Sequence, residues 1–351
     1  MDNIIIPNEV DIINSIDADW SKPIVTFLCI TYNQQDYIAD AIEGFLTQKT
    51  SFPYEILIHD DCSTDDTRKV IDSYKAKYPN LIRTVYQKEN QHSKGEPITL
   101  VAARYARTEY IALCEGDDYW INNNKTENQL NLMLKDPSIT MVVSSGKEQY
   151  GDKITSNIVG FNGNKVRQIN PQYILDSKGS LAPTASYIVK KEFLIKSREL
   201  FKDAPVGDLF IELYNAVYGK LIYYPEVVCV YRRMAKNSWS SKMASNLDNA
   251  IKHSEGIQKT IEYSKKLDGF KSLDWTNARA SNLFNLAILH LYQNDIDGFK
   301  KYIGLSNTYK TPKGRKRIIF KMRNHGQFLY YVLHTRKYIL SKLRSFTTNS
   351  K

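Results

Sequence analysis

The stretch Tyr110–Trp120, with the sequence YIALCEGDDYW, decides the fold class of this chain and locates its candidate site. Its first five residues are apolar, as in a strand covered on both faces, and Glu115, Asp117 and Asp118 follow at once. Close carboxylates repel each other, so one of them stays protonated unless a cation lies between them. Mg²⁺ and Mn²⁺ prefer oxygen ligands and often join a few carboxylates to substrate phosphates. A solvated acidic turn is the alternative, and the neighbouring segments decide between the two.

Strand-like and helix-like segments alternate over the first 145 residues. Apolar runs predict strands at residues 24–30, 54–59, 82–86, 110–114 and 140–144. Helical periodicity predicts helices at residues 37–46, 65–77, 98–106 and 125–134. Strands separated by helices of this length are typical of βαβ units. The pattern therefore predicts a Rossmann-like α/β fold, with a mostly parallel sheet flanked by helices.

The pattern changes after this region. Residues 146–180 are polar and are expected to be irregular, and a strand at 184–189, a helix at 208–218 and a strand at 221–231 follow. Beyond about residue 243 the pattern is helical, with segments at 247–267, 277–293 and 297–303. We expect four parts, which are an N-terminal extension (1–21), a main α/β domain (22–242), a helical C-terminal domain (243–309) and a basic amphipathic tail (310–351).

The net charge of +10 belongs to this tail, because residues 310–351 contain twelve Lys and Arg and no acidic residue. The rest of the chain carries about −2. No stretch approaches the roughly 20 apolar residues that span a bilayer, and the start of the chain lacks the pattern of a signal peptide, so we expect a cytoplasmic protein. Basic and apolar residues mixed in the tail suit an anionic membrane surface and predict peripheral attachment to its inner face. Solvated charge around an ordinary packing helix is the alternative.

Polar clusters follow three of the predicted strands, at Thr31-Tyr32-Asn33, at Asp60-Asp61-Cys62-Ser63 and at Asp117-Asp118. Ligands of parallel sheets bind beyond the carboxyl ends of the strands, so the three clusters are expected to form one site. Helix capping explains the acids at 65 and 66, which complement the positive end of the next helix. It does not explain Asp60-Asp61, where a carboxylate could accept hydrogen bonds from a uracil imide or a ribose hydroxyl.

In order and spacing, these three clusters resemble the successive motifs of family 2 glycosyltransferases, over roughly residues 22–240. The resemblance implies a GT-A fold, a nucleotide-diphosphate sugar as donor, a divalent metal (Mn²⁺ or Mg²⁺) and inversion at the anomeric carbon. It implies that Thr31, Tyr32 and Asn33 bind the nucleotide sugar and that Asp61 contacts the base. It also implies that Asp117 contacts the ribose or a metal-bound water, or joins the metal shell, and that Asp118 binds the metal.

Two further segments resemble parts of the same family. Asp208 opens a predicted helix after Gly207, where the resemblance implies the catalytic base that takes the acceptor proton, and a plain helix cap is the alternative. Residues 231–240 resemble a flexible lid, and Arg232 and Arg233 in it are expected to neutralise the diphosphate. Many relatives carry a His where this chain has Met234, so metal binding is expected to depend on Asp118, the phosphates and water.

The expected reaction is transfer of a sugar, UDP-linked, to a glycan or lipid-linked acceptor in polysaccharide or glycolipid synthesis. A nucleic-acid-binding module acting through the tail is one alternative, but the tail shows no nucleic-acid-binding fold and nucleic acid is not an expected partner. A sugar-nucleotide pyrophosphorylase is another, although that class needs a Gly-rich phosphate loop and residues 30–36 contain no Gly. A dehydrogenase is excluded because no GxGxxG follows the first strand.

Overall fold

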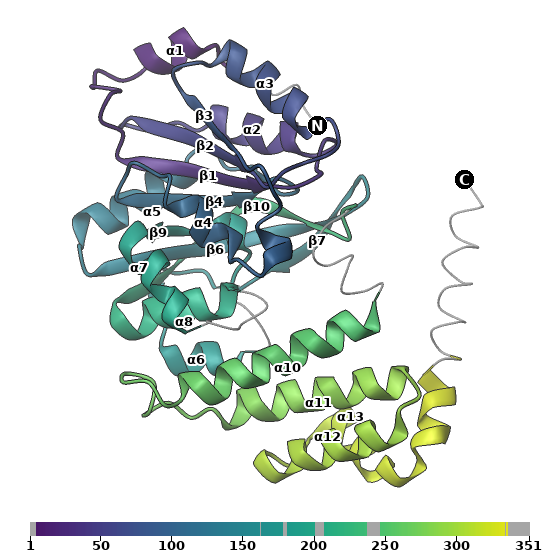
Figure 1. Ribbon diagram of the computed structural model, residues 1–351. Coiled ribbons are helices and arrows are strands. Elements are labelled where there is room, and N and C mark those ends of the chain that lie inside the picture. The colour runs from purple at the N-terminus through teal and green to yellow at the C-terminus, as the bar shows by residue number, and fades with distance from the viewer. Residues whose placement is uncertain are drawn as a thin grey trace. The chain divides into compact units, whose positions relative to one another are not determined.

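The structure is a computed structural model that describes residues 5–161, 163–177, 181–200, 207–236, 246–333 and 335. The chain forms two compact units (Figure 1). The first comprises the described residues up to Leu200 together with residues 207–236, and the second begins at Asn246. Among the described residues, no helix combines the length and the apolar character needed to cross a membrane.

A mixed sheet of ten strands forms the centre of the first unit. The strands are β1 (Val25–Thr31), β2 (Tyr54–Asp60), β3 (Ile82–Tyr86), β4 (Tyr110–Glu115), β5 (Tyr119–Trp120), β6 (Ile139–Tyr150), β7 (Lys153–Val159), β8 (Arg167–Gln168), β9 (Ile188–Lys190) and β10 (Lys220–Arg233). Their order is β3-β2-β1-β4-β9-β6-β10-β5, with β7 beside β6 and β8 beside β10. The first four are parallel, β9 runs antiparallel to both of its neighbours, and β10 is parallel to β6.

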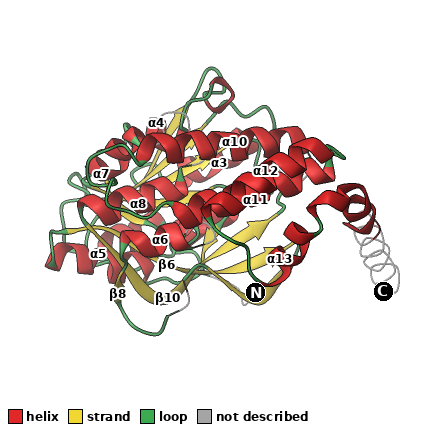
Figure 2. Cartoon of the chain, turned by 90° about the horizontal axis from the view of Figure 1, so that it is seen from below, coloured by secondary structure: helices red, strands yellow, loops and turns green. Residues whose placement is uncertain are grey.

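Helices connect and cover these strands (Figure 2, helices red and strands yellow). In the first unit they are α1 (Glu9–Asn14), α2 (Ile38–Leu46), α3 (Thr67–Lys77), α4 (Ile98–Ala103), α5 (Lys125–Lys135), α6 (Pro171–Asp176), α7 (Lys191–Lys196) and α8 (Asp208–Tyr218). Short 3₁₀ turns lie at η1 (His92–Lys94), η2 (Thr184–Ser186) and η3 (Ser197–Glu199). The α/β fold class predicted from the sequence is confirmed, and the parallel strands are those that the apolar runs predicted.

Two predictions for the middle of the chain are wrong. The segment predicted as a strand at 184–189 is a 3₁₀ turn followed by the three-residue strand β9, which fits between β4 and β6. Residues 146–180, predicted to be irregular, continue β6 to Tyr150 and return as β7. The exposed and intermediate residues of β7 explain its polar sequence, because a strand with solvent on its faces shows no apolar run.

The central parallel strands β1, β2 and β4 are buried on both faces. Phe27, Ile56 and Ala112 belong to one hydrophobic cluster, while Leu28 and Leu57, which point to the other face, are also fully buried. This double burial explains why the strands appear in the sequence as continuous apolar runs rather than as alternating ones.

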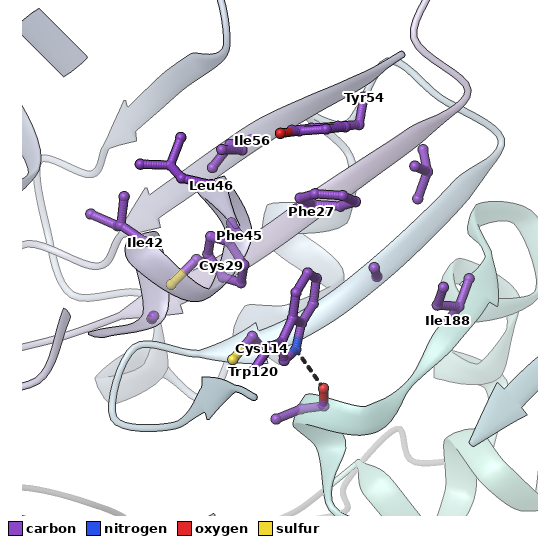
Figure 3. Close-up of a cluster of buried hydrophobic side chains, with 14 of the residues drawn as sticks. Phe27, Cys29, Ile42, Phe45, Leu46, Tyr54, Ile56, Cys114, Trp120 and Ile188 are labelled. Atoms are coloured by element: carbon purple, nitrogen blue, oxygen red, sulfur yellow. Dashed lines mark hydrogen bonds between the residues drawn. The ribbon is translucent and has the colours of Figure 1, made fainter. Parts of the chain in front are cut away.

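Trp120 anchors the segment that follows the acidic turn (Figure 3). Its ring packs edge-on against Phe27 and Phe45, with centroids 5.1 and 4.7 Å away. Its Nε1 donates a hydrogen bond of 2.7 Å to the carbonyl of Ala185. The indole is therefore part of the core, and it fixes where the turn between β4 and β5 begins and ends.

The second unit is helical in its described residues. It contains α10 (Leu247–Ser264), α11 (Thr276–Tyr292), α12 (Ile296–Tyr309), α13 (Gly314–Lys321) and the turn η4 (Arg323–His325), and residues 327–333 are helical as well. Phe284, Leu291, Phe299 and Ile303 form its core, and Leu329 from the predicted tail joins them.

Candidate active site

The acidic turn begins at the carboxyl end of β4, beside the end of β1. Gly116 donates its N–H to the carbonyl of Ile30 at 2.9 Å. A Cβ on Gly116 would lie 2.7 Å from Thr31 Oγ1 and 2.5 Å from Gln34 Oε1. Only glycine allows this approach, so the close packing of the two strand ends fixes the position of the acids that follow.

Burial raises the pKa of all three acids of the turn. The pKa of Glu115 rises to about 8, with further contributions from the charges of Asp208 and Asp117. The pKa of Asp118, which is 2% exposed, is raised well above its usual range by burial and then by repulsion from Asp117 and Glu115. Asp117 also has a raised pKa because of burial. Concentrated negative charge of this kind favours binding of a cation or of a proton.

Asp208, at the start of α8, belongs to the same cluster of acids. Burial raises its pKa, and Thr184 of η2 lies close enough to Asp208 and Glu115 to offset part of the rise in both pKa values. The helix cap position is held by Gly207, which makes no side-chain cap hydrogen bond. Three segments that are far apart in the sequence meet here. They are the end of β4, the turn η2 and the first turn of α8.

Glu212, one turn after Asp208, ties α8 to the segment that carries Thr184. Its carboxylate accepts hydrogen bonds from the N–H groups of Leu181 and Ala182 and from the hydroxyl of Tyr187, the last at 2.6 Å. Glu212 is fully buried, and this burial raises its pKa to about 8. Sequence reasoning missed this residue, although its spacing of four from Asp208 places both side chains on one face of a helix.

The predicted nucleotide-binding residues lie at the ends of β1 and β2. Thr31 is buried and its hydroxyl donates to Gln34 at 2.8 Å, while Tyr32 is partly exposed. Asn33 has a positive φ of 54°, and its N–H donates to Ser63 Oγ at 2.8 Å. The two strand ends are thus joined in one polar surface next to the acidic turn.

Asp61 supports the loop that follows β3. It is buried, and its two carboxylate oxygens accept the backbone N–H groups of Gln91 and His92 at 2.7 and 3.0 Å. Asp60, before it, is ion-paired with Arg68 at 2.6 Å. In the structure, both acids therefore hold loops at the carboxyl edge of the sheet.

Arg232 contacts the acidic turn directly. Its backbone N–H donates to Asp118 Oδ1 at 2.8 Å, and its Nη1 donates to the Asp117 carbonyl at 3.1 Å. The guanidinium forms an ion pair with Asp40 and lies 4.4 Å from the ring centroid of Tyr119. The sequence predicted an arginine for the diphosphate here, and the structure shows a buried arginine that braces the turn.

Arg233 and Met234 point elsewhere. Arg233 pairs with Glu148 at 2.9 Å, and Met234, with a φ of 62°, is 51% exposed. The backbone N–H of Lys236 donates to the hydroxyl of Tyr37 at 3.2 Å. Residues 237–240, the remainder of the predicted lid, lie outside the described residues.

The acidic turn suits a divalent cation by its chemistry. Among the described residues, no three His, Cys, Asp or Glu side chains are arranged to hold a metal without further ligands. A cation shared with substrate phosphates needs only one or two carboxylates from the protein, however. Asp117 and Asp118 supply hard oxygen ligands, and Glu115 Oε2 is buried without a hydrogen-bond partner. The residues present therefore fit such an ion.

Comparison with known proteins identifies the family. Residues 26–192 match the model of glycosyl transferase family 2. An uncharacterized protein of Mycobacterium tuberculosis is 30% identical over 243 residues, which are 68% of this chain and 67% of that protein. An Escherichia coli protein, UDP-Glc:α-D-GlcNAc-diphosphoundecaprenol β-1,3-glucosyltransferase WfaP, is 34% identical over 110 residues, 31% of this chain and 41% of that protein.

Solved structures share the fold at low sequence identity. Staphylococcus aureus TarS 1–349 in complex with UDP-GlcNAc superposes with a TM-score of 0.60 at 14% identity, covering 91% of this chain and 92% of that one. The mannosyltransferase PcManGT of Pyrobaculum calidifontis, in complex with GDP-Man and Mn²⁺, gives a TM-score of 0.51 at 15% identity and covers 96% and 90%. These glycosyltransferase structures show that the fold is of the GT-A type. The matching family model and the relatives establish that the chain belongs to glycosyl transferase family 2 and is a glycosyltransferase.

Proposed function

We propose that the enzyme transfers a sugar from a UDP-linked donor to a hydroxyl of a glycan or lipid-linked acceptor, with inversion at the anomeric carbon. The observation that carries this proposal is the acid cluster at the carboxyl end of β4. Asp117 and Asp118 carry carboxylate oxygens, and the charge of Asp208 acts on Glu115 of the same turn. This nearness supports the proposal, because an inverting displacement needs a donor-binding group and a proton acceptor close to each other.

Asp208 is the proposed general base. An inverting transfer is a single displacement, so the acceptor hydroxyl must lose its proton as its oxygen attacks the anomeric carbon. Burial raises the pKa of Asp208, which makes the carboxylate a stronger base than a solvated aspartate. Thr184, beside the carboxylate, offsets part of this rise in the pKa of Asp208.

The donor binds along the ends of β1, β2 and β4 in this proposal. Thr31, Tyr32 and Asn33 form the wall of the base pocket, and Asp61 holds the neighbouring loop in place through the N–H groups of residues 91 and 92. A divalent cation at Asp117 and Asp118 would neutralise the charge that develops on the departing diphosphate. Arg232 holds the Asp118 carboxylate and the Asp117 carbonyl in position. Arg233 would reach the phosphates only by giving up its ion pair with Glu148.

The printed names of related proteins support the donor and acceptor classes. The TarS structure contains UDP-GlcNAc, and the name of the E. coli relative specifies a UDP-glucose donor and a lipid diphosphate-linked acceptor. Manganese in the PcManGT complex supports a divalent cofactor. We place the enzyme in polysaccharide or glycolipid synthesis, in keeping with these names.

The test separates donor binding from transfer. UDP-sugars are screened by thermal shift with Mn²⁺ or Mg²⁺, since a bound donor stabilises the folded state by mass action. Asp118→Asn should abolish metal-dependent donor binding. Asp208→Asn should keep donor binding and lower the transfer rate by about 10²–10⁴-fold. Asp152→Asn, an exposed acid in the turn after β6, is the matched control and should change neither.

Two results would contradict the proposal. Full activity of Asp208→Asn would remove this residue from the role of base. A product with the anomeric configuration of the donor, determined by NMR, would exclude a single displacement.

A further inference from the structure

The helical segment after α12 has one face that packs against the core of the second unit and one face that is exposed to solvent. Ile319 and Phe320 of α13 pack against the core of the second unit. Farther along, Leu329 belongs to that core, and Leu333 packs on it. Leu329 and Leu333 therefore face inward, whereas the neighbouring Val332 is exposed.

The outer side of the same segment carries large apolar side chains in contact with solvent. Ile318 is 60% exposed, Phe328 58%, Tyr331 60% and Val332 45%. Phe328, Tyr331 and Val332 are spaced three and four residues apart, so they share one face of the helical residues 327–333. Several large apolar residues exposed within fifteen positions are a typical sign of an interaction surface.

The charge of this region has a single sign. After Asp297 the sequence contains no acidic residue and fourteen Lys and Arg. Among these, Lys313, Arg315, Arg317 and Lys321 are exposed around α13. Arg315 and Lys321 lie three positions before and after Ile318, so one face of α13 presents an apolar side chain between two cations.

We propose that residues 313–333 dock onto an anionic lipid bilayer. In this arrangement Ile318, Phe328, Tyr331 and Val332 enter the boundary between headgroups and acyl chains, and Arg315, Arg317 and Lys321 contact lipid phosphates. The charge is complementary to anionic headgroups over the whole segment. Exposed aliphatic side chains such as Ile318 and Val332 favour lipid over nucleic acid, because they gain nothing from a phosphate backbone in water. The proposal is independent of the proposed transfer reaction.

The experiment is vesicle co-flotation of the full chain. One set of vesicles contains phosphatidylcholine alone, and the other contains equal parts of phosphatidylcholine and phosphatidylglycerol. Wild-type protein should float only with the second set. Replacing Arg315, Arg317 and Lys321 by Gln removes three cations and should lower partitioning on the order of a hundredfold, because each contributes roughly a fivefold gain at an anionic surface.

Two further variants make the test specific. Phe328→Ser combined with Tyr331→Ser and Val332→Ser should lower partitioning at least about tenfold without loss of charge. The matched control replaces three exposed lysines of the first unit by Gln, at positions 22, 135 and 153, and should float as the wild type does. Thermal unfolding followed by circular dichroism reports that each variant is folded, and the melting temperature of each should match that of the wild type.

Each outcome of the flotation experiment either supports or contradicts binding to the bilayer. The proposal is overturned by equal flotation with both kinds of vesicle, by an apolar variant that floats as well as the wild type, or by a control that loses as much binding as the charge variant. Tighter binding of a single-stranded oligonucleotide than of anionic vesicles, lost in the same charge variant, would assign the surface to nucleic acid instead. Charge-dependent and apolar-dependent flotation together support the bilayer.

Discussion

Lys125, the first residue of α5, is the least expected residue of the core, and its replacement by methionine should stabilise the enzyme. The side chain is fully buried, and its Nζ has no hydrogen-bond partner among the described residues. The ammonium lies 4.2 Å from the ring centroid of Trp120. Burial lowers the pKa of Lys125 from 10.5 to about 7, against the weaker opposing influence of Cys229 and Cys114.

The size of the effect follows from this pKa. One pKa unit corresponds to about 1.4 kcal/mol, so near pH 7 the folded state is roughly 4 kcal/mol less stable than it would be if Lys125 kept its ordinary pKa. The interaction with Trp120 already offsets part of the desolvation, and its loss reduces the gain. Methionine keeps the unbranched chain and much of the volume, so we expect Lys125→Met to raise the free energy of unfolding by about 2–4 kcal/mol.

The pH dependence gives the sharper test. Since the folded-state pKa lies below the unfolded value of 10.5, the unfolded chain binds the additional proton between about pH 7 and 10.5. Wild-type stability therefore gains from Lys125 as pH rises through this window, and the advantage of Lys125→Met shrinks by up to about 1.4 kcal/mol per pH unit. Other groups titrate in the same range, but they contribute equally to both proteins and cancel in the difference.

Urea unfolding followed by circular dichroism, at several pH values from about 7 to 9, measures that difference. Lys135→Met, at the exposed end of the same helix, is the control, and its difference from wild type should not change with pH. A less stable Lys125→Met, or an advantage that stays constant with pH, would show that the buried amine is not held in its neutral form.

Three further substitutions, two of them each compared with a second substitution, test the packing around the acid cluster. Gly116→Ala places a Cβ within 2.7 Å of a threonine oxygen and should cost about 1–3 kcal/mol in urea unfolding and reduce transfer, whereas Gly304→Ala in an open helix position should gain about 0.5–1 kcal/mol. Glu212→Gln replaces one carboxylate oxygen by an NH₂ group, which cannot accept a hydrogen bond. The free energy of unfolding should fall by about 1–3 kcal/mol, and kcat should fall as well. Unchanged values of both would contradict the role of Glu212 in holding the 181–187 segment. Arg232→Met should lower the free energy of unfolding by about 1–3 kcal/mol and Arg233→Met by less than about 1 kcal/mol, because only Arg232 is buried. Equal losses for the two variants would contradict the role of Arg232 in holding the acidic turn.

The sequence predicted the part of the fold in which local pattern and environment agree. The strands β1, β2 and β4 are buried on both faces, so apolar residues dominate each of them, and the bounds of these strands and of β3 are found within a residue or so. The strand β9 could not be found in this way. It is three residues long and owes its conformation to antiparallel pairing with β4 and β6, which no local pattern records.

The acids of the site were predictable as a group, but their partners were not. Asp117 and Asp118 are conspicuous in the sequence because two carboxylates follow an apolar strand. Arg232 is conspicuous as a basic residue at the end of a predicted strand, yet its contact with Asp40 joins residues 192 positions apart and its contact with Asp118 residues 114 apart. A basic residue near a predicted phosphate site suggests phosphate binding, and only coordinates show that its charge is already balanced by a carboxylate.

The distribution of unfavourable groups in the first unit suggests how its stability and its activity are related. Burial raises the pKa of Glu115, Asp117, Asp118 and Asp208, so each of them favours a protonated folded state and weakens the fold as pH rises above the ordinary range of carboxyl groups. A sequence selected for stability alone would replace them with apolar residues. Their retention at one edge of the sheet is explained if a cation and a phosphate-bearing donor neutralise them during the reaction. Lys125 differs from these acids, since its buried amine has no hydrogen-bond partner among the described residues and no proposed role in the reaction. Its replacement should therefore stabilise the enzyme and leave the acid cluster intact.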